Sequence, residues 1–186
     1  KWRNQMTRCD WAKTVLEIDY HDQEWGKPKY DDAILFEMLI LEGMQAGLSW
    51  STILVKRENY RKALDGFDPQ KIKDYDQDKL DSLLQDAGLI RNRLKMRAIV
   101  KNAKAFIQVQ AEFGSFSNYL WQYVSGHPIQ HDYQTLSDVP ASNDISEQMS
   151  QDMKKRGFSF VGPTICYAYM QSVGLVNDHL VSCDYR

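Results

Sequence analysis

Apolar residues recur at spacings of three and four through most of this chain, which is the periodicity of helices that bury one face. No run alternates between apolar and polar residues as a half-buried strand does. The helical pattern is carried by residues 35–50, 51–64, 79–86, 93–113, 116–124, 145–157 and 164–175. Helix-start residues precede two of these segments, at Asp76 and at 142–144, and a further start signal stands at Asp68-Pro69, ahead of Gln70. The sequence therefore predicts an all-α protein built of short helices.

One domain accounts for the length of the chain. Its 186 residues, 43% of them hydrophobic, are enough to bury a core and fall in the range of a single domain. Residues 125–142 lack periodicity and contain Pro128 and Pro140, which predicts a loop. Because helical patterns resume after this loop, we interpret residues 1–186 as one domain.

The sequence favours a cytoplasmic protein without membrane segments. The longest nearly apolar run, residues 160–170, is interrupted by Gly162 and Pro163 and is far shorter than the roughly 20 residues of a spanning helix. Residues 1–11 lack the apolar core of a signal peptide. Three cysteines spread over the whole chain suit reduced thiols better than a disulfide framework. Cys166 stands in an apolar stretch and is expected to pack as a small hydrophobe.

Two cysteine and histidine pairs stand near the two ends of the sequence: Cys9 with His21, and His179 with Cys183. The second pair has a spacing of four and would share one face if that segment is helical. Thiolates and imidazoles in a Cys2His2 set fill the tetrahedral shell of zinc, which leaves no open position for catalysis. The spacing leaves open the alternative of two ordinary histidines and two incidental cysteines. His127 and His131 lie in the polar loop, where we expect them to be exposed.

Residues 80–106 have the outline of a helix-hairpin-helix, with two amphipathic segments joined by a turn at 87–90. Backbone N–H groups in such a turn can bind a phosphate without reading sequence. The net charge of −2 gives no global attraction for polyanions, so the attraction must be local. Local positive charge is present at Arg91, Arg93, Lys95, Arg97, Lys101 and Lys104, with a second basic patch at 56–62. The alternative is an ordinary helical hairpin with a solvated cationic face.

Four aromatic residues gather in the first quarter of the chain, around one acidic residue in an apolar segment. They are Trp11, Tyr20, Trp25 and Trp50, and the acidic residue is Glu42. A buried carboxylate is costly without a partner, so Glu42 should have a specific one. Aromatic faces with one acidic acceptor suit a flat, electron-poor base that presents N–H donors. The alternative is a set of core aromatics, with Glu42 bound to an arginine or a helix N-terminus.

Several motifs, in order and over nearly the whole chain, closely resemble the bacterial 3-methyladenine DNA glycosylase I family of the helix-hairpin-helix superfamily. They are CDW near the start, YHDQEWG, LFEMLILEGMQAGLSW, KRENYRKAL, QDAGLIRNRLKMRAIVKNAKAF, KKRGFSFVGPTICYAYMQSVGLVNDH and Cys183. The resemblance implies a helix-hairpin-helix glycosylase fold and one structural Zn²⁺. The metal would be bound by Cys9, His21, His179 and Cys183 and would join segments 9–21 and 179–183.

The resemblance also implies roles for individual residues. Glu42 would accept hydrogen bonds from the lesion as the candidate catalytic residue, with Tyr20 and Trp50 against the base. Trp11 and Trp25 would complete the pocket wall. The residues expected on DNA are Leu48, which would enter the duplex, and Gly88, Arg91 and Arg93, which would bind its backbone. The chain departs from the family at Glu17, where a tyrosine often stands.

The activity that the resemblance implies is removal of 3-methyladenine from alkylated double-stranded DNA, with the free base as product. Methylation at N3 makes adenine cationic and weakens the glycosidic bond. Residues 114–121 contain no carboxylate where many helix-hairpin-helix glycosylases carry a catalytic aspartate. We therefore expect a monofunctional hydrolase that recognises its lesion through the pocket, and monomeric action on duplex DNA is the simplest expectation. The alternative is a non-enzymatic, zinc-stabilised module that binds damaged DNA.

Overall fold

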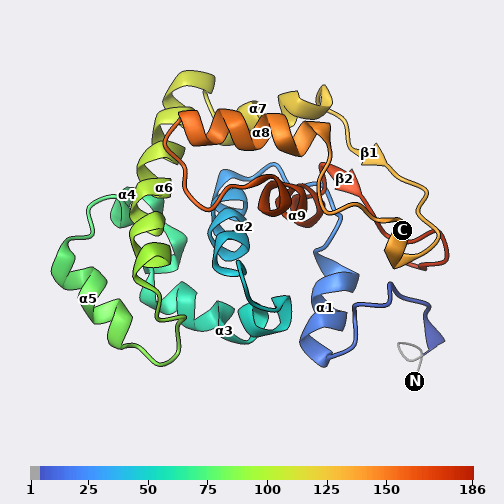
Figure 1. The fold of residues 1–186 in the computed structure, drawn as a ribbon, viewed down its shortest axis with the longest axis horizontal. Helices are drawn as coiled ribbons and strands as arrows, with labels where there is room; N and C mark the ends of the chain where they lie inside the picture. Colours follow the sequence, from blue (N-terminus) through green and yellow to red (C-terminus); the bar gives the residue numbers. More distant parts are fainter. Residues whose placement is uncertain (1–4) are drawn as a thin grey trace.

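The computed structural model describes residues 5–186, and helices make up most of the described chain (Figure 1). The helices are α1 (Val15–Gln23), α2 (Asp32–Met44), α3 (Trp50–Ala63), α4 (Pro69–Ile72), α5 (Gln77–Gln85), α6 (Arg93–Phe113), α7 (Phe116–Trp121), α8 (Asp144–Lys155) and α9 (Pro163–Val173). Short 3-10 turns lie at Asp65–Phe67, Gln122–Val124 and Leu136–Asp138. The prediction of a mostly helical fold is confirmed. None of the described helices is long and apolar enough to cross a membrane.

Helix α2 lies at the centre of the fold, between α6 and α9 (Figure 1). Its residues from Leu35 to Met44 are all buried, because the apolar run leaves no polar face to present to water. Helices α7 and α8 lie across one side of this core, with α8 packed on α9. The buried position of α2 takes Glu42 into the interior along with its apolar neighbours.

The predicted helix over 35–50 is wrong in its second half. Helix α2 ends at Met44, and residues 45–49 form a turn in which Gly47 has φ of 77°. Ser49 then starts α3 by accepting a hydrogen bond from the backbone N–H of Thr52. Glycine adopts this left-handed conformation without strain, so the chain reverses here and leaves Leu48 at the tip of the turn, 40% exposed.

Helix α1 was not predicted, although its start carries a recognisable signal. Thr14 and Glu17 form a capping box. The Thr14 hydroxyl accepts a hydrogen bond from the backbone N–H of Glu17, and the Glu17 carboxylate accepts one from the backbone N–H of Thr14. The helix is short and only its last turn is buried, so its hydrophobic periodicity is weak.

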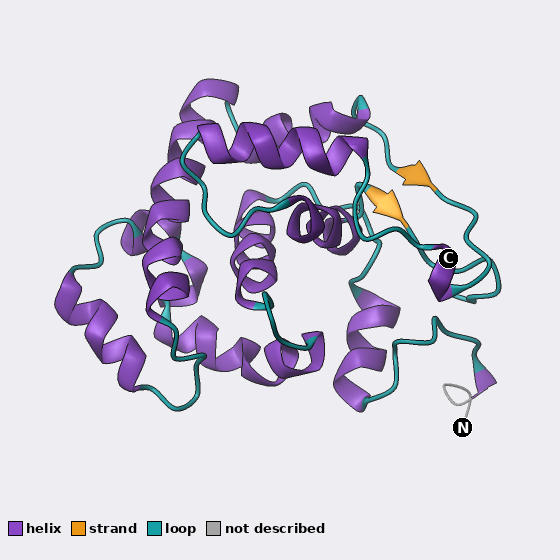
Figure 2. Ribbon diagram, viewed as in Figure 1, coloured by secondary structure: helices purple, strands orange, loops and turns teal. Residues whose placement is uncertain are grey.

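The loop at 125–142, here called the cavity loop, is an extended segment fixed to the C-terminal residues (Figure 2). Strand β1 (Ile129–Gln130) pairs in parallel with β2 (Val176–Asn177), with Ile129 opposite Val176. The expectation that no strand forms is therefore wrong at this point. A two-residue strand is too short to show alternation, so the sequence pattern carries no sign of it.

Candidate functional site

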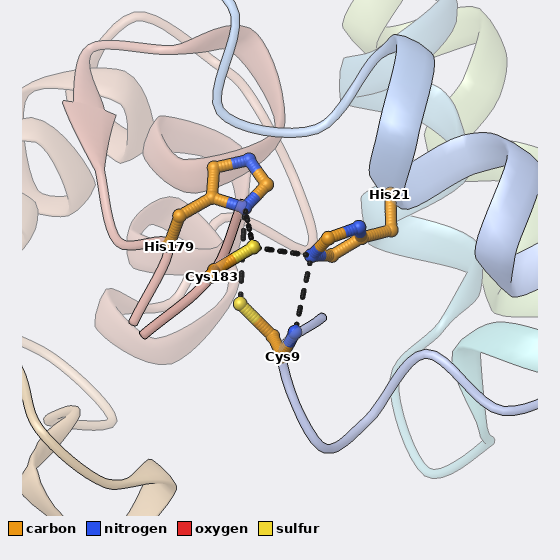
Figure 3. Close-up of side chains that lie close together, drawn as sticks. All are labelled: Cys9, His21, His179 and Cys183. Atoms are coloured by element: carbon orange, nitrogen blue, oxygen red, sulfur yellow. Dashed lines mark hydrogen bonds between the residues drawn. The ribbon is translucent and has the colours of Figure 1, made fainter. Parts of the chain in front are cut away.

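Cys9, His21, His179 and Cys183 meet in one buried group, here called the Cys2His2 cluster (Figure 3). Their four ligand atoms all lie within 4.8 Å of one another. Cys183 Sγ is 3.5 Å from His21 Nε2 and 3.4 Å from His179 Nδ1, and Cys9 Sγ is 3.7 Å from His179 Nδ1. Tetrahedral zinc with the usual sulfur and nitrogen bond lengths has ligand-to-ligand edges of roughly 3.3 to 3.8 Å. The donor set and its spacing therefore fit a zinc ion.

Each histidine of the Cys2His2 cluster is oriented through its other ring nitrogen. His21 Nδ1 lies 2.8 Å from Asp22, whose carboxylate is held by Arg8 at 2.9 Å. His179 Nε2 lies 2.9 Å from the carbonyl oxygen of Trp25. Such contacts fix the tautomer that leaves the inner nitrogen free to bind a metal. Burial lowers the pKa of His179 to about 4, so its ring is neutral, as a metal ligand must be.

His179 and Cys183 do not lie on a helix, so their spacing of four does not place them on one helical face. Both follow β2 in a turn, in which the backbone N–H of Cys183 donates to the carbonyl of Leu180 at 2.8 Å. The prediction that the Cys2His2 cluster joins the two ends of the chain is confirmed, and both ends lie on the same side of the molecule (Figure 1). The backbone N–H of Asp184 also donates to the carbonyl of Thr7 at 2.9 Å.

Next to the Cys2His2 cluster lies a cavity of about 480 Å³, here called the aromatic cavity. All five residues predicted for the pocket line it, namely Trp11, Tyr20, Trp25, Glu42 and Trp50. The ring centroids of Tyr20 and Trp50 are 5.3 Å apart, and those of Trp11 and Trp25 are 5.2 Å apart. Trp25 is stacked on His21 with an interplanar angle of 17°, so the cluster supports one wall of the cavity.

Three polar atoms in the lining of the aromatic cavity lack a hydrogen-bond partner. Among the buried side chains of residues 5–186, five polar atoms are in this state. Three of them belong to cavity residues: the Tyr20 hydroxyl, Glu42 Oε2 and Trp50 Nε1. Buried polar groups are normally paired, so a concentration of two donors and one acceptor at one cavity indicates a polar ligand. Oε2 of Glu42 binds neither an arginine nor a helix N-terminus, which was the alternative interpretation of this residue.

The carboxyl group of Glu42 is uncharged in the empty cavity at neutral pH. Burial raises its pKa to about 8, against a smaller opposing effect of the Ser172 hydroxyl. A positively charged ligand beside this group would favour the ionised form instead. The protonation of Glu42 is therefore able to respond to the charge of whatever enters the cavity.

Sequence reasoning missed the contribution of the cavity loop. Its residues Leu136, Val139, Pro140 and Ala141 line the aromatic cavity. The loop is held by Asp178, which lies 2.6 Å from His131 Nδ1 and also accepts hydrogen bonds from Tyr167 and Gln171. His131 is thus paired and half-buried, contrary to the expectation of exposure, whereas His127 is exposed and Cys166 is buried as predicted. The neighbouring residue types gave no sign of this pairing.

The predicted hairpin lies between α5 and α6, and the side chain of Asn59 approaches Gly88 closely there. A Cβ atom at this position would lie 2.9 Å from Nδ2 of Asn59, which donates to the carbonyl of Gly88. The N–H of Gly88 donates to Asp86 at 2.8 Å, so a carboxylate occupies it in this structure. Arg91 and Arg93 are both exposed beside the turn.

Two of the predicted basic surfaces are smaller than the sequence indicates. Lys95 is only 5% exposed, and its amine donates to the carbonyls of Met44 and Ala46 at 2.9 and 2.6 Å. It therefore holds the end of α2 and the turn that carries Leu48, and does not face solvent. In the second patch, Arg57 and Arg61 both bind Glu37. The exposed positive charge that remains beside the hairpin is at Arg91, Arg93, Arg97, Lys101 and Lys104.

Comparison with known proteins gives a consistent result. Residues 11–186 match the family model described as methyladenine glycosylase. The chain is 50% identical to a protein named DNA-3-methyladenine glycosylase from Haemophilus influenzae, over 95% of this chain and 96% of that protein. It is similar to a crystal structure of 3-methyladenine DNA glycosylase I, with a TM-score of 0.94, 46% identity and coverage of 96% and 98%. A variant of such an enzyme in complex with 3-methyladenine gives a TM-score of 0.94 at 36% identity, covering 97% of each chain.

Proposed function

The chain belongs to the methyladenine glycosylase family, and we propose that it excises 3-methyladenine from alkylated double-stranded DNA as a monofunctional enzyme. The observation that carries this proposal is the set of unpartnered buried polar atoms in the aromatic cavity, at Tyr20, Glu42 and Trp50. A flipped base has a flat apolar body with polar edges and would satisfy both features at once. A volume of about 480 Å³ leaves room for one base and part of its sugar.

Selection of the lesion would rest on its charge. Methylation at N3 gives adenine a positive charge, and a cation stacked on or flanked by aromatic rings gains roughly 1 to 2 kcal/mol when desolvated. Tyr20 and Trp50 would provide these rings, and Trp11 and Trp25 would close the wall. Glu42 would ionise as the cation enters and accept a hydrogen bond from its amino group. Normal adenine is neutral and would obtain neither benefit.

The reaction follows from the charge of the bound base. When the bond between N9 and C1′ breaks, its electron pair moves to the base, which leaves as a neutral molecule. The sugar becomes oxocarbenium-like, and a water molecule adds to C1′ and loses a proton to solvent. We assign Glu42 as the catalytic residue because its carboxyl lines the cavity with an unpartnered oxygen, so it would contact the reacting base and hold it in the orientation for departure.

Strand cleavage through a Schiff base would need an amine in the aromatic cavity. The described residues that line the cavity include no lysine. The two most strongly held amines, those of Lys29 and Lys95, donate to backbone carbonyls instead. Borohydride should therefore trap no covalent adduct between this protein and DNA.

A single structural Zn²⁺ would be bound by Cys9, His21, His179 and Cys183, because their spacing fits a tetrahedral shell. When bound, the ion supplies a cross-link and no catalytic chemistry, since all four positions are filled. The residues of the Cys2His2 cluster would then position the cavity wall, through Trp25 stacked on His21 and through Cys9, which itself lines the cavity.

Binding to the DNA duplex would use residues on the face beside the cavity. Leu48, at the tip of the turn between α2 and α3, would fill the space left by the flipped base. Gly88 with Arg91 and Arg93 would bind the phosphate backbone, which needs no sequence readout. We infer that residues 1–186 act as one domain, as a monomer and in the cytoplasm, where duplex DNA is the substrate.

The test is chromatography of the bases released from methylated duplex DNA by the intact protein and by Glu42→Gln. Selective release of 3-methyladenine, strongly reduced in the variant, is the expected result. DNA binding with no released base would favour the alternative of a damaged-DNA-binding module. The names of the similar proteins, all of them glycosylases, favour the enzyme.

A further inference from the structure

A second carboxylate, that of Glu17, lines the aromatic cavity together with Glu42. Glu17 lies in the first turn of α1, and Tyr20 on the same helix also lines the cavity. Glu17 Oε2 accepts hydrogen bonds from the backbone N–H groups of Lys13 at 3.1 Å and Thr14 at 3.0 Å. The capping box therefore fixes this side chain in place at the cavity.

The two carboxyl groups of Glu17 and Glu42 differ in charge. The hydrogen bond from the backbone N–H of Thr14 holds the pKa of Glu17 below its ordinary value, in spite of partial burial. Burial has the opposite result at Glu42, whose pKa rises to about 8. At neutral pH the empty cavity therefore has an ionised carboxylate at Glu17 and a neutral carboxyl at Glu42.

The third acidic residue of the lining, Asp178, is not available to a ligand in the same way. Its carboxylate accepts hydrogen bonds from Tyr167 and Gln171 and lies against His131. Glu17 is the lining carboxylate whose hydrogen bonds come from the backbone N–H groups of Lys13 and Thr14, and the nearby charge of Lys13 also favours its ionised form. The same carboxylate lines the cavity and can act on its contents.

We propose that Glu17 is a specificity-determining residue, which attracts the cationic methylated base into the aromatic cavity and loses most of that attraction once the base leaves as a neutral molecule. This inference rests on the proposed function. Two opposite charges several ångströms apart in a partly desolvated site attract each other appreciably, whereas a neutral base has no net charge to attract. Glu17 would thus favour the damaged base over normal adenine and favour release of the product.

Glu17→Gln separates the charge from the structural role of the residue. Glutamine at the third position of a helix also completes a capping box, so α1 should remain intact. A matched control is Asp31→Asn, because Asp31 caps α2 through the backbone N–H of Ala33 and does not line the cavity. Asparagine is an equally good helix cap, so this change removes one charge without removing the cap.

Two measurements at pH 7.5 test the inference. The first is the rate of 3-methyladenine release from methylated duplex DNA, resolved into kcat and KM. The second is the affinity for free 3-methyladenine, followed by quenching of tryptophan fluorescence, since the free base is neutral at this pH. We expect Glu17→Gln to raise KM by about 3- to 10-fold with little change in kcat and no change in affinity for the free base. Asp31→Asn should resemble the unsubstituted protein in both.

Two results would overturn the inference. An unchanged KM in Glu17→Gln would show that the charge does not act on the substrate. An equal loss in KM and in affinity for the free base would show that the substitution merely distorts the cavity. If the unsubstituted protein releases no 3-methyladenine at all, the proposed function fails first, and this inference falls with it.

Discussion

The Cys2His2 cluster and the aromatic cavity share a wall, because Cys9 belongs to both, yet they treat buried polar atoms in opposite ways. In the cluster, every ligand atom lies next to another ligand atom, and both histidines are oriented by further contacts. In the cavity, Tyr20, Glu42 and Trp50 each keep a polar atom without a partner. One region is arranged to fix the chain, and the other keeps its hydrogen-bonding capacity for a ligand.

This difference has an energetic meaning. An unpaired buried donor or acceptor costs about 1 to 3 kcal/mol, so a lining that keeps such atoms lowers the stability of the fold. Functional sites commonly carry such a cost, and stability is supplied elsewhere in the fold. Here that stability would come from the Cys2His2 cluster next to the cavity, whose residues can bind a metal.

The largest expected effect comes from removing one ligand of the Cys2His2 cluster. Cys183→Ala should lose the bound metal and destabilise the protein by several kcal/mol, because a structural zinc site contributes on the order of 10 kcal/mol to folding. Cys166→Ala is the matched control, since Cys166 is buried away from the cluster and its loss should cost only about 1 kcal/mol. Metal content by mass spectrometry and thermal unfolding with and without a chelator measure both.

A protein that carries no zinc, and whose unfolding temperature a chelator does not change, would contradict this prediction. The contrast between the two regions would then fail, because the cluster would be no more than four packed side chains.

The second effect is a gain in stability, and it is expected from a substitution of Glu42 in the aromatic cavity. The pKa of Glu42 is raised in the folded protein to about 8, so between roughly pH 4.5 and 8 the folded state binds more protons than the unfolded state. The stability due to this group is present at the acidic end and is lost as pH rises, by up to about 1.4 kcal/mol per pH unit. Glu42→Gln cannot titrate, so its stability should exceed that of the unsubstituted protein increasingly from pH 5 to pH 8.

Urea unfolding at several pH values measures this difference, and base release measures its functional counterpart. Excision by Glu42→Gln should fall about 10- to 100-fold, the loss of a hydrogen bond to a charged group. A variant that is both less stable at pH 8 and fully active would reverse the interpretation of Glu42.

A smaller effect is expected where the hairpin meets the cavity. Lys95→Met keeps the apolar stem but removes the donor to the carbonyls of Met44 and Ala46, which should cost about 2 kcal/mol. Because these carbonyls lie at the base of the turn that carries Leu48, excision should fall more than affinity for the free base. Lys101→Met, on the exposed side of α6, is the control. If Lys95→Met and Lys101→Met have equal free energies of unfolding and equal rates of excision, Lys95 does not position the turn that carries Leu48.

The smallest effect is expected at the surface. Arg93 is largely exposed and only loosely paired with Asp81, at 4.0 Å. Arg93→Gln should weaken DNA binding a few-fold and reduce the slope of log affinity against log salt concentration by about 1, without changing stability. Lys155→Gln, on α8, should leave the salt dependence unchanged. Equal slopes in all three proteins would place the phosphate contacts elsewhere.

The sequence predicts residue types at the site better than the way they are brought together. The four ligands and five cavity residues carry distinctive side chains, and the structure brings each set together. Their local geometry depends on long-range contacts, and the helix that would have put His179 and Cys183 on one face does not form. Lys95 was grouped with the surface charges because its partners are backbone carbonyls, which no side-chain pattern reveals. The end of one helix and the start of the next at residues 45–49 could have been predicted, because Gly47 is followed by the capping residue Ser49.

The Cys2His2 cluster also sets the order in which the molecule is completed. Cys9 and His179 are 170 positions apart, whereas the hairpin between α5 and α6 is made of neighbouring segments. Contacts between distant segments are slow to form, since the entropy of closing a long loop must be lost first. We therefore expect the wall containing Trp11 and Trp25 to close after the hairpin between α5 and α6 has formed, because closing it takes up most of the loop entropy of the chain.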